Sequence, residues 1–341
     1  MDQIGMAVLG AGYWGPNLIR NIRAIGDADL RWICDLDVAR AERANGPRST
    51  TRVTGVLDNV LEDPDVKAVC IATPAATHVE VGLACIESGK HVMIEKPLAL
   101  SSGDASKLAA AARDAGVVLM CDHTYCYTPA VRHIRSLVQE GSIGELQYFD
   151  SVRINLGLVQ TDVDVFWDLA PHDLSILDFI LPPGVHVEAV AAQGADPISA
   201  GRACLGYLTL RLSSGAIAHA HVNWLSPTKI RTTIIGGSDR IVVWDDLHPT
   251  QRVSMFDRGV QLNGGLEARR DKLVSYRLGN MVAPALPEEE ALQVALREFL
   301  ASITEGRAPA TDGNAGIRVI RMLEAASRSM ELDGATVPVE A

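Results

Sequence analysis

The sequence predicts a mixed fold: a doubly wound α/β domain with a parallel sheet, followed by an α+β domain with an open, mostly antiparallel sheet. Strand-like and helix-like segments alternate over residues 1–123, which is typical of a parallel sheet with helices on both faces. From about residue 145 the pattern changes to strands joined by short turns. A chain of 341 residues is also too long for one ordinary core. We therefore expect one domain over 1–123 and a second over 124–341, with the terminal helix packed in the second domain or back on the first.

The amino-acid composition limits the kinds of molecule that this protein is expected to bind. Apolar residues make up 48% and charged residues 21%, as in an ordinary globular protein. The net charge of −11 argues against nucleic acid or an anionic membrane as the main partner, because clustered cations are needed to bind either of them. No apolar stretch is long enough to span a bilayer, and the first residues lack the pattern of a signal peptide. The six cysteines have no disulfide or metal-binding spacing, so we expect a cytoplasmic protein with reduced thiols and no metal.

The first domain contains five recognisable strand-like runs, which are short, apolar and end in turn or polar residues. They are IGMAVLGAG, ADLRWICD, VKAVCIATP, HVMIEKP and VVLMCDH. Helical stretches such as GPNLIRNIRAIG and SSGDASKLAAAARDAG lie between them. In a doubly wound sheet the ligand binds outside the carboxyl ends of the strands. The residues that end these runs are therefore the first candidates for a site.

The first strand ends in GAGYWG, whose three glycines have G-x-G-x-x-G spacing. Glycine is needed there for a tight turn, for close approach of the backbone to a pyrophosphate and for helix–strand packing. The residues of this turn that we assign to the cofactor are Gly10, Gly12, Tyr13, Trp14 and Gly15. The motif directly follows a strand and opens a helix, which favours dinucleotide binding over a structural turn in another α/β fold.

Asp35 ends the second strand, where a carboxylate accepts hydrogen bonds from the ribose hydroxyls. A carboxylate about 4 Å from a 2′-phosphate repels it by about 4 kcal/mol per charge pair at an effective dielectric constant near 20. NAD is therefore predicted as the cofactor in preference to NADP. Arg40 is a further cofactor candidate, because an arginine near this strand end can stack on adenine or reach a phosphate.

Two more strand ends bring polar groups to the same edge of the sheet. We assign to the cofactor Thr73, Pro74 and His78 after one strand, and Glu95 and Lys96 after the next. Proline follows Lys96 and restricts it to extended geometry, which points its ammonium along the strand axis over the crevice. The alternative is a structural lysine tethered to Glu95 or to a backbone carbonyl.

The segment FWDLAPHDLSILDFI (166–180) places a carboxylate, Asp168, and an imidazole, His172, four residues apart in a helical pattern. Such a pair shares one helix face and can be in contact. In the structural interpretation Asp168 caps the helix and His172 is a core histidine. In the functional interpretation they are a general base and its orienting carboxylate. Pro171 is compatible with this helix because we expect it to fall in the first turn, where its missing N–H has no cost.

These motifs resemble those of the Gfo/Idh/MocA oxidoreductases. The matching stretches are GAGYWGPN, Asp35, ATPAATHVE, EKP and WDLAPHDLS, in the order typical of the family, and the resemblance covers nearly the whole chain. It implies a Rossmann domain, a tightly held nicotinamide cofactor, and sugar, cyclitol or nucleotide-sugar substrates. It also implies dimers or tetramers formed through the second-domain sheet. WDLAPHDLS and GYWGPN resemble the nucleotide-sugar branch, which includes enzymes that oxidise C3 of UDP-N-acetylhexosamines. Many members carry an aspartate where this chain has Ser175, with Asp173 beside the histidine instead.

The resemblance implies that Lys96, Asp168 and His172 are catalytic. An imidazole with its usual pKa near 6.5 can take the proton of a substrate hydroxyl. Asp168 would orient the ring, while Lys96 would hold the same hydroxyl and stabilise developing negative charge. The expected substrate contacts are Lys96, His123, Tyr125, Arg153, Asp168 and His172.

The expected reaction is thus NAD-dependent oxidation of a secondary hydroxyl, at C3, of a nucleotide-linked hexose. Alternatives on the same scaffold are a free sugar or inositol dehydrogenase, a 3-ketoreductase of a nucleotide deoxysugar, and a hydrolase that uses NAD transiently to cleave glycosides. An alternative of another class is a non-catalytic NAD-binding regulator.

The second domain is expected to contain six strand-like runs: LQYFDSVRINLG, HVEAVAAQGA, ACLGYLTLRLSSG, AIAHAHVNWLS, IRTTIIGGS and DRIVVWDD. Helices are expected over about 168–181, 287–305 and 312–331. His219 and His221 share a strand face, but alternation on a half-exposed sheet explains them better than a metal does. The charged cluster at 267–272 is interpreted as a solvated loop, with a nucleotide-diphosphate contact as the alternative.

Overall fold

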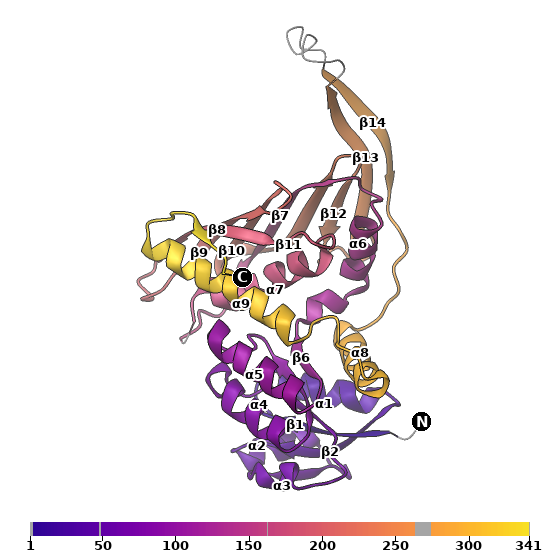
Figure 1. Cartoon of the computed structure of the whole chain (residues 1–341), viewed down its shortest axis with the longest axis vertical. Helices are drawn as coiled ribbons and strands as arrows, with labels where there is room; N and C mark the ends of the chain where they lie inside the picture. The colour runs from indigo at the N-terminus through magenta and orange to yellow at the C-terminus, as the bar shows by residue number, and fades with distance from the viewer. Residues whose placement is uncertain (1–2, 48, 162, 263–273, 341) are drawn as a thin grey trace. The chain divides into compact units, whose positions relative to one another are not determined.

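The computed structural model describes residues 3–47, 49–161, 163–262 and 274–340. The chain forms two compact units (Figure 1). The first comprises Met1–Thr128 and Glu289–Glu324, and the second comprises Pro129–Glu288 and Ala325–Ala341. The late segment therefore groups with the amino-terminal part of the chain. The domain limits expected at 123 and 124 stay a prediction.

The first unit contains a six-stranded parallel sheet in the order β3-β2-β1-β4-β5-β6. The strands are β1 (Ile4–Leu9), β2 (Ala28–Cys34), β3 (Arg52–Thr54), β4 (Ala68–Ile71), β5 (His91–Glu95) and β6 (Leu119–Asp122). This is the strand order of the doubly wound dinucleotide-binding fold, whose ligand crevice lies where the order reverses, between β1 and β4. The strands β4 and β6 are buried along their whole length, which explains their uninterrupted apolar sequences.

Helices connect the strands of this sheet. They are α1 (Gly15–Ala24), α2 (Val38–Asn45), α3 (Asp58–Leu61), α4 (His78–Glu87) and α5 (Ser102–Asp114), with short 3-10 turns η1 (Ala75–Thr77) and η2 (Thr124–Tyr127). Side chains cap the starts of α2 and α5. For example, the Ser101 hydroxyl caps α5 by accepting a hydrogen bond from the Asp104 N–H at 3.1 Å.

The late segment contributes α8 (Ala291–Glu305) and the first part of α9 (Gly313–Glu331) to the first unit. An Arg20–Glu290 ion pair at 2.6 Å joins the start of α8 to α1. Ahead of α9, Thr311 exchanges backbone and side-chain hydrogen bonds with Cys121 of β6 at 2.8 and 2.7 Å. These contacts explain why residues distant in sequence belong to the same unit.

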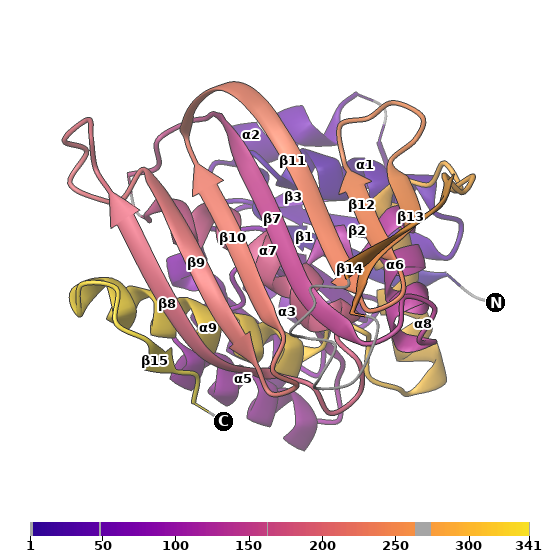
Figure 2. The same cartoon turned by 90° about the horizontal axis from the view of Figure 1, so that it is seen from above.

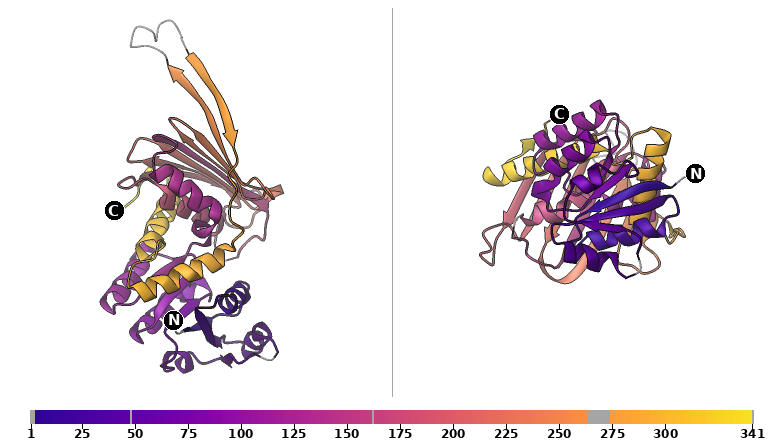
Figure 3. Two further views of the ribbon diagram at one scale, coloured as in Figure 1. Left: turned by 90° about the vertical axis from the view of Figure 1, so that its right-hand side faces the viewer. Right: turned by 90° about the horizontal axis from the view of Figure 1, so that it is seen from below.

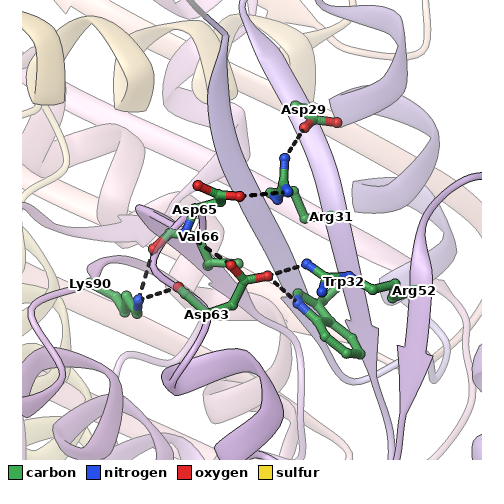
Figure 4. Close-up of polar contacts among 8 residues, drawn as sticks. All are labelled: Asp29, Arg31, Trp32, Arg52, Asp63, Asp65, Val66 and Lys90. Atoms are coloured by element: carbon green, nitrogen blue, oxygen red, sulfur yellow. Dashed lines mark hydrogen bonds and ion pairs between the residues drawn. The ribbon is translucent and has the colours of Figure 1, made fainter.

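A partly buried polar network lies at the amino ends of the strands, away from the carboxyl ends (Figure 4). Asp63 accepts a hydrogen bond from the Trp32 indole at 2.8 Å and pairs with Arg52, whose guanidinium lies 4.1 Å above the Trp32 ring. Lys90 is only 6% exposed, and its ammonium donates to the carbonyls of Asp63 and Val66 at 2.9 Å each. The burial of this lysine is thus offset by two hydrogen bonds.

The second unit is built on a nine-stranded sheet in the order β14-β13-β12-β11-β7-β10-β9-β8-β15 (Figure 2). Among the described residues, neighbouring strands of this sheet are antiparallel except for β10 and β7, which are parallel. The strands are β7 (Leu146–Leu156), β8 (Val187–Ala195), β9 (Leu205–Leu212), β10 (Ile217–Asn223), β11 (Leu225–Gly237), β12 (Ile241–Asp245), β13 (Val253–Leu262), β14 (Val274–Val282) and β15 (Val337–Pro338). Figure 3 shows the β13–β14 hairpin extending beyond the other strands of its sheet. The sequence did not predict this hairpin.

Helices α6 (Pro129–Gln139) and α7 (Val165–Ile180) pack together, and α7 lies against β7, β9 and β10. The strand β10 alternates between buried and accessible positions, which confirms the one-sided pattern expected from AHAHVNW. Helix α6 was not expected from the sequence. In the described part of the chain, no helix is both long and apolar enough to cross a membrane.

Candidate active site

A cavity of about 750 Å³ lies in the first unit at the carboxyl ends of β1, β2, β4 and β5. Eleven of the twelve residues predicted to bind the cofactor line it, and the twelfth, Gly15, opens α1 next to it. The eleven are Gly10, Gly12, Tyr13, Trp14, Asp35, Arg40, Thr73, Pro74, His78, Glu95 and Lys96. The structure therefore brings together residues from four strand ends, although their individual contacts to a cofactor remain a prediction.

The glycine-rich turn fits a dinucleotide. A Cβ at Gly15 would meet the carbonyl oxygen of Gly10 at 2.1 Å, and Gly10 itself has a φ of +94° that disfavours other residues. A Cβ at Gly12, in contrast, would face open space. No side chain caps α1 at Trp14, but Pro16 has no N–H and the Asn17 N–H donates to the Trp14 carbonyl at 2.9 Å. The turn thus has room for a pyrophosphate beside Gly12.

Asp35 lies directly after β2, and its side chain is 9% exposed. One carboxylate oxygen accepts a hydrogen bond from the Ala11 N–H at 2.7 Å, and the other accepts from the Asp37 N–H at 2.8 Å. Arg40 lies 3.3 Å from the second oxygen. The carboxylate is therefore fixed beside the glycine-rich turn, and the nearby arginine pairs with it.

His78 connects the ends of β4 and β5. Its ring nitrogens lie 2.8 Å from the Pro97 carbonyl oxygen and 2.9 Å from the Thr73 carbonyl oxygen, and the residue is 1% exposed. Burial lowers the pKa of His78, while the two carbonyls oppose that shift. His78 thus ties the Thr73 turn to the turn that follows Lys96.

The end of β6 places His123 in the interior, 2% exposed, and neither ring nitrogen has a hydrogen-bond partner among the described residues. Burial, together with the positive charges of Lys96 and Arg318, lowers the pKa of the His123 imidazole to about 3. The ring is therefore neutral at physiological pH. Tyr125 follows in η2 and is half-buried.

In the second unit, α7 carries Asp168 and His172, both half-buried. The helix begins at Val165 and its cap is Asp164, whose carboxylate accepts from the N–H groups of Phe166 and Trp167 at 3.0 Å each. The interpretation of Asp168 as the cap is therefore wrong. Its carboxylate instead accepts a hydrogen bond from the buried Trp224 indole at 2.9 Å.

The expectation that Pro171 falls in the first turn of this helix is also wrong. The helix starts earlier than the sequence pattern indicated, so Pro171 lies inside it and is buried. Proline has no N–H to donate to the preceding turn, which leaves a backbone carbonyl without its usual helical donor next to Asp168 and His172.

Arg153, predicted to contact the substrate, is 3% exposed and forms a buried ion pair with Asp173. Its Nε donates to one carboxylate oxygen at 2.8 Å and Nη2 to the other at 3.1 Å. The Ser151 hydroxyl donates to the same carboxylate at 2.7 Å. This pair attaches α7 to β7 one residue after His172.

Sequence reasoning missed Trp224 and Asp122. For Trp224 the signal is a tryptophan directly after an alternating strand, because a buried indole N–H needs a hydrogen-bond acceptor. Asp122 ends β6 beside Glu95 of β5, and the signal was a carboxyl group closing each of two adjacent apolar strands.

Among the described residues, no cluster of His, Cys, Asp and Glu side chains is arranged to hold a metal ion. His219 and His221 stack on Tyr207, with ring centroids 6.0 and 4.4 Å away. The six cysteines are buried thiols. The charged cluster at 267–272 lies outside the described residues.

Comparisons with known proteins agree with this fold. The family model for the NAD-binding Rossmann fold of the Gfo/Idh/MocA oxidoreductases matches residues 4–123, and the model for the C-terminal α/β domain of that family matches 135–339. The chain is 27% identical to UDP-N-acetylglucosamine 3-dehydrogenase of Acidithiobacillus ferrooxidans, over 94% of this chain and 95% of the relative. A solved structure of that name and organism has a TM-score of 0.83 at 25% identity, covering 97% of this chain and 99% of the other.

Two further relatives differ in their named activity. Myo-inositol 2-dehydrogenase of Thermotoga maritima is 24% identical over 96% of both chains. The structure of GenD2 from gentamicin A biosynthesis, solved in complex with NAD, has a TM-score of 0.82 at 26% identity and covers 100% of this chain and 97% of that one. Because family models match both halves of the chain, this protein is a member of the Gfo/Idh/MocA oxidoreductase family with an NAD-binding Rossmann domain.

Proposed function

We propose that the protein oxidises a secondary hydroxyl, at C3, of a nucleotide-linked hexose. In this proposal His172 is the general base, Asp168 orients its imidazole and Lys96 binds the reacting hydroxyl. The observation that best supports it is the hydrogen bond from the Trp224 indole to Asp168 at 2.9 Å. Asp164 already caps the helix, so Asp168 is not needed there and is instead held in place one turn before a histidine.

Bound NAD supplies the hydride acceptor. The chain's own residues must position the substrate and take its proton. His172 would accept the hydroxyl proton, and the fixed carboxylate of Asp168 would favour the imidazolium that results. The Lys96 ammonium would donate to the substrate oxygen and stabilise negative charge as it develops. General base catalysis of this kind contributes about 10²–10⁴ in rate.

The substrate class is supported by the relative that acts on UDP-N-acetylglucosamine, at 27% identity over nearly the full length. The second candidate is a free cyclitol, which is favoured by the myo-inositol 2-dehydrogenase relative at 24% identity. Both reactions remove hydride from a ring carbon that bears a secondary hydroxyl, so the same base and ammonium could serve either.

A panel of UDP- and TDP-hexoses and inositols, each tested with NAD by thermal shift and by NADH formation, separates these candidates. The proposal predicts that a UDP-N-acetylhexosamine raises the melting temperature and yields NADH. Deuterium at C3 of that sugar should slow NADH formation in single turnovers, whereas deuterium at C4 should not. Stabilisation and turnover with inositols alone would contradict the nucleotide-sugar assignment.

We also propose a homodimer or homotetramer that associates through the second-unit sheet. Tyr207 of β9 and Ile217 of β10 lie on the same face of this sheet, and they are 43% and 50% exposed. Exposed apolar side chains on a broad sheet favour association between copies. Sedimentation of the wild type and of Ile217→Glu tests this, with the variant expected to dissociate. An unchanged sedimentation coefficient would exclude this face.

A further inference from the structure

Two carboxyl groups meet at the carboxyl edge of the first-unit sheet. Glu95 is the last residue of β5, Asp122 is the last residue of β6, and the two are register partners in the parallel pair. Asp122 is 2% exposed. Glu95 and its neighbour Lys96 line the cofactor cavity. The pair therefore lies beside a residue that the proposed function makes catalytic.

In each of the two carboxyl groups, one oxygen accepts a hydrogen bond from a described residue and the other does not. Glu95 Oε2 accepts from the Lys96 backbone N–H at 3.2 Å, and Asp122 Oδ1 accepts from the Thr124 hydroxyl at 2.8 Å. The other two oxygens, Glu95 Oε1 and Asp122 Oδ2, are inaccessible to solvent and receive no hydrogen bond from a donor among the described residues. As register partners on adjacent parallel strands, the two side chains project side by side from the same face of the sheet. Two ionised carboxylates cannot form a hydrogen bond with each other, whereas one shared proton would satisfy both buried oxygens.

The surroundings favour the proton on Glu95. Burial and the negative charge of Asp122 raise the pKa of Glu95 well above its ordinary value. Burial also raises the pKa of Asp122, but the Thr124 hydroxyl and the nearby Trp14 indole N–H favour its ionised form.

We propose that Glu95 is a neutral carboxylic acid at physiological pH, donates its proton to ionised Asp122, and with it places a single negative charge beside Lys96. Glu95 and Asp122 are then positioning residues, and their relevance to catalysis rests on the function proposed above for Lys96. The single negative charge of the pair then balances the positive charge of the Lys96 ammonium. Two carboxylates would leave an uncompensated charge in the interior.

Amide substitutions test the shared proton without changing shape. Glu95→Gln and Asp122→Asn each leave one carboxylate and one neutral donor, whereas the double variant leaves no carboxylate. Infrared spectra at pH 8 should show a protonated-carboxyl C=O stretch in the wild type that is absent from Glu95→Gln. The matched control Glu87→Gln, an exposed carboxyl in the same unit, should retain it. Identical spectra for the wild type and Glu95→Gln would overturn the proposal.

Stability gives a second readout. Because the folded-state pKa of Glu95 is raised, the wild type should lose stability as pH rises above 4.5 towards that raised value. Glu95→Gln cannot lose this proton, so its melting temperature should increasingly exceed that of the wild type as pH rises, whereas Glu87→Gln should follow the wild type. If added KCl or MgCl₂ stabilised the wild type but not Glu95→Gln, a bound cation would replace the proton and the proposal would be wrong.

The rate at which Lys96 is acetylated in the intact protein tests the charge beside it. Mass spectrometry measures this rate at a fixed pH. A neighbouring carboxylate favours an ammonium over the reactive amine. Lys96 should therefore react at least threefold faster in the double variant than in either single variant. Equal rates in all three would show that the pair does not set the charge around Lys96. None of these measurements uses substrate turnover, so their failure is distinguishable from failure of the proposed dehydrogenase activity.

Discussion

The indole Nε1 of Trp224 donates a hydrogen bond to Asp168 Oδ2 at 2.9 Å, and Trp224 is 1% exposed. A buried indole N–H directed at a carboxylate restricts the positions that this carboxylate can adopt. Asp168 lies one turn before His172 on α7, so Trp224 indirectly supports the orientation of the proposed base. In the proposed mechanism Trp224 is therefore a positioning residue, although it lies far from the motif in the sequence.

Trp224→Phe should lower kcat/KM about tenfold, because a hydrogen bond to a charged group contributes about 1.5–3 kcal/mol and 1.4 kcal/mol corresponds to a factor of ten. Steady-state kinetics on the proposed substrate check this. The matched control is Trp167→Phe, since that indole extends from α7 itself and donates to Ser327 at 3.0 Å. An equal loss in both variants would point to general packing instead.

The Arg153–Asp173 pair predicts a stability effect. Arg153→Met leaves a buried carboxylate without its cation, so the free energy of unfolding should fall by about 3–5 kcal/mol. Adding Asp173→Leu should recover most of this loss, because an apolar pair then replaces the ion pair. Urea denaturation measures both variants. If Arg153→Met left stability intact but abolished substrate binding, Arg153 would be a substrate contact rather than a structural residue.

The carboxylate of Asp35 predicts that the protein prefers NAD to NADP. Asp35→Ser should raise the ratio of kcat/KM with NADP to kcat/KM with NAD at least tenfold, since it removes a repulsion of up to about 4 kcal/mol. The change also releases Arg40, which lies 3.3 Å from Asp35. Asp35→Ser/Arg40→Ser should therefore show a smaller gain. No change in the ratio would mean that Asp35 does not face the ribose.

The buried His123 predicts sensitivity to acid. Its pKa of about 3 in the folded state is depressed from 6.5, so the unfolded chain takes up a proton first as pH falls. Stability present above pH 6.5 should decline by about 1.4 kcal/mol per pH unit down to the folded-state pKa. His123→Leu should lose less stability than the wild type between pH 7.5 and 5, as measured by urea unfolding. The exposed His186→Gln serves as the control, and parallel curves for the wild type and His123→Leu would refute this prediction.

Much of the first unit follows from its sequence. The glycine spacing, the apolar strands and the polar residues that close them predicted a parallel sheet with a site at its carboxyl edge, and the cavity lies there. The second unit was less predictable. The hairpin of β13 and β14 and the helix α6 were missed, because short alternating strands and an amphipathic helix in a polar connection give weak local signals.

The candidate site shows a similar limit. Asp168 and His172 could be selected because i and i+4 positions share a helix face, but Trp224 reaches Asp168 from 56 residues away. The sequence pattern predicts that α7 starts near residue 168, whereas the helix begins at Val165 after its Asp164 cap, so the prediction of Pro171 in the first turn is wrong. The Glu95–Asp122 contact depends on strand order, which brings β5 and β6 together. Long-range partners of this kind are set by tertiary packing and leave no periodic signal in the sequence.

The most direct test of the central claim, that His172 is the base in oxidation of a sugar hydroxyl, is single-turnover NADH formation by the wild type and His172→Asn with a UDP-N-acetylhexosamine. The account predicts that the variant binds NAD with unchanged affinity and forms NADH at least about a hundredfold more slowly. Near-normal NADH formation by His172→Asn would remove this histidine from the mechanism.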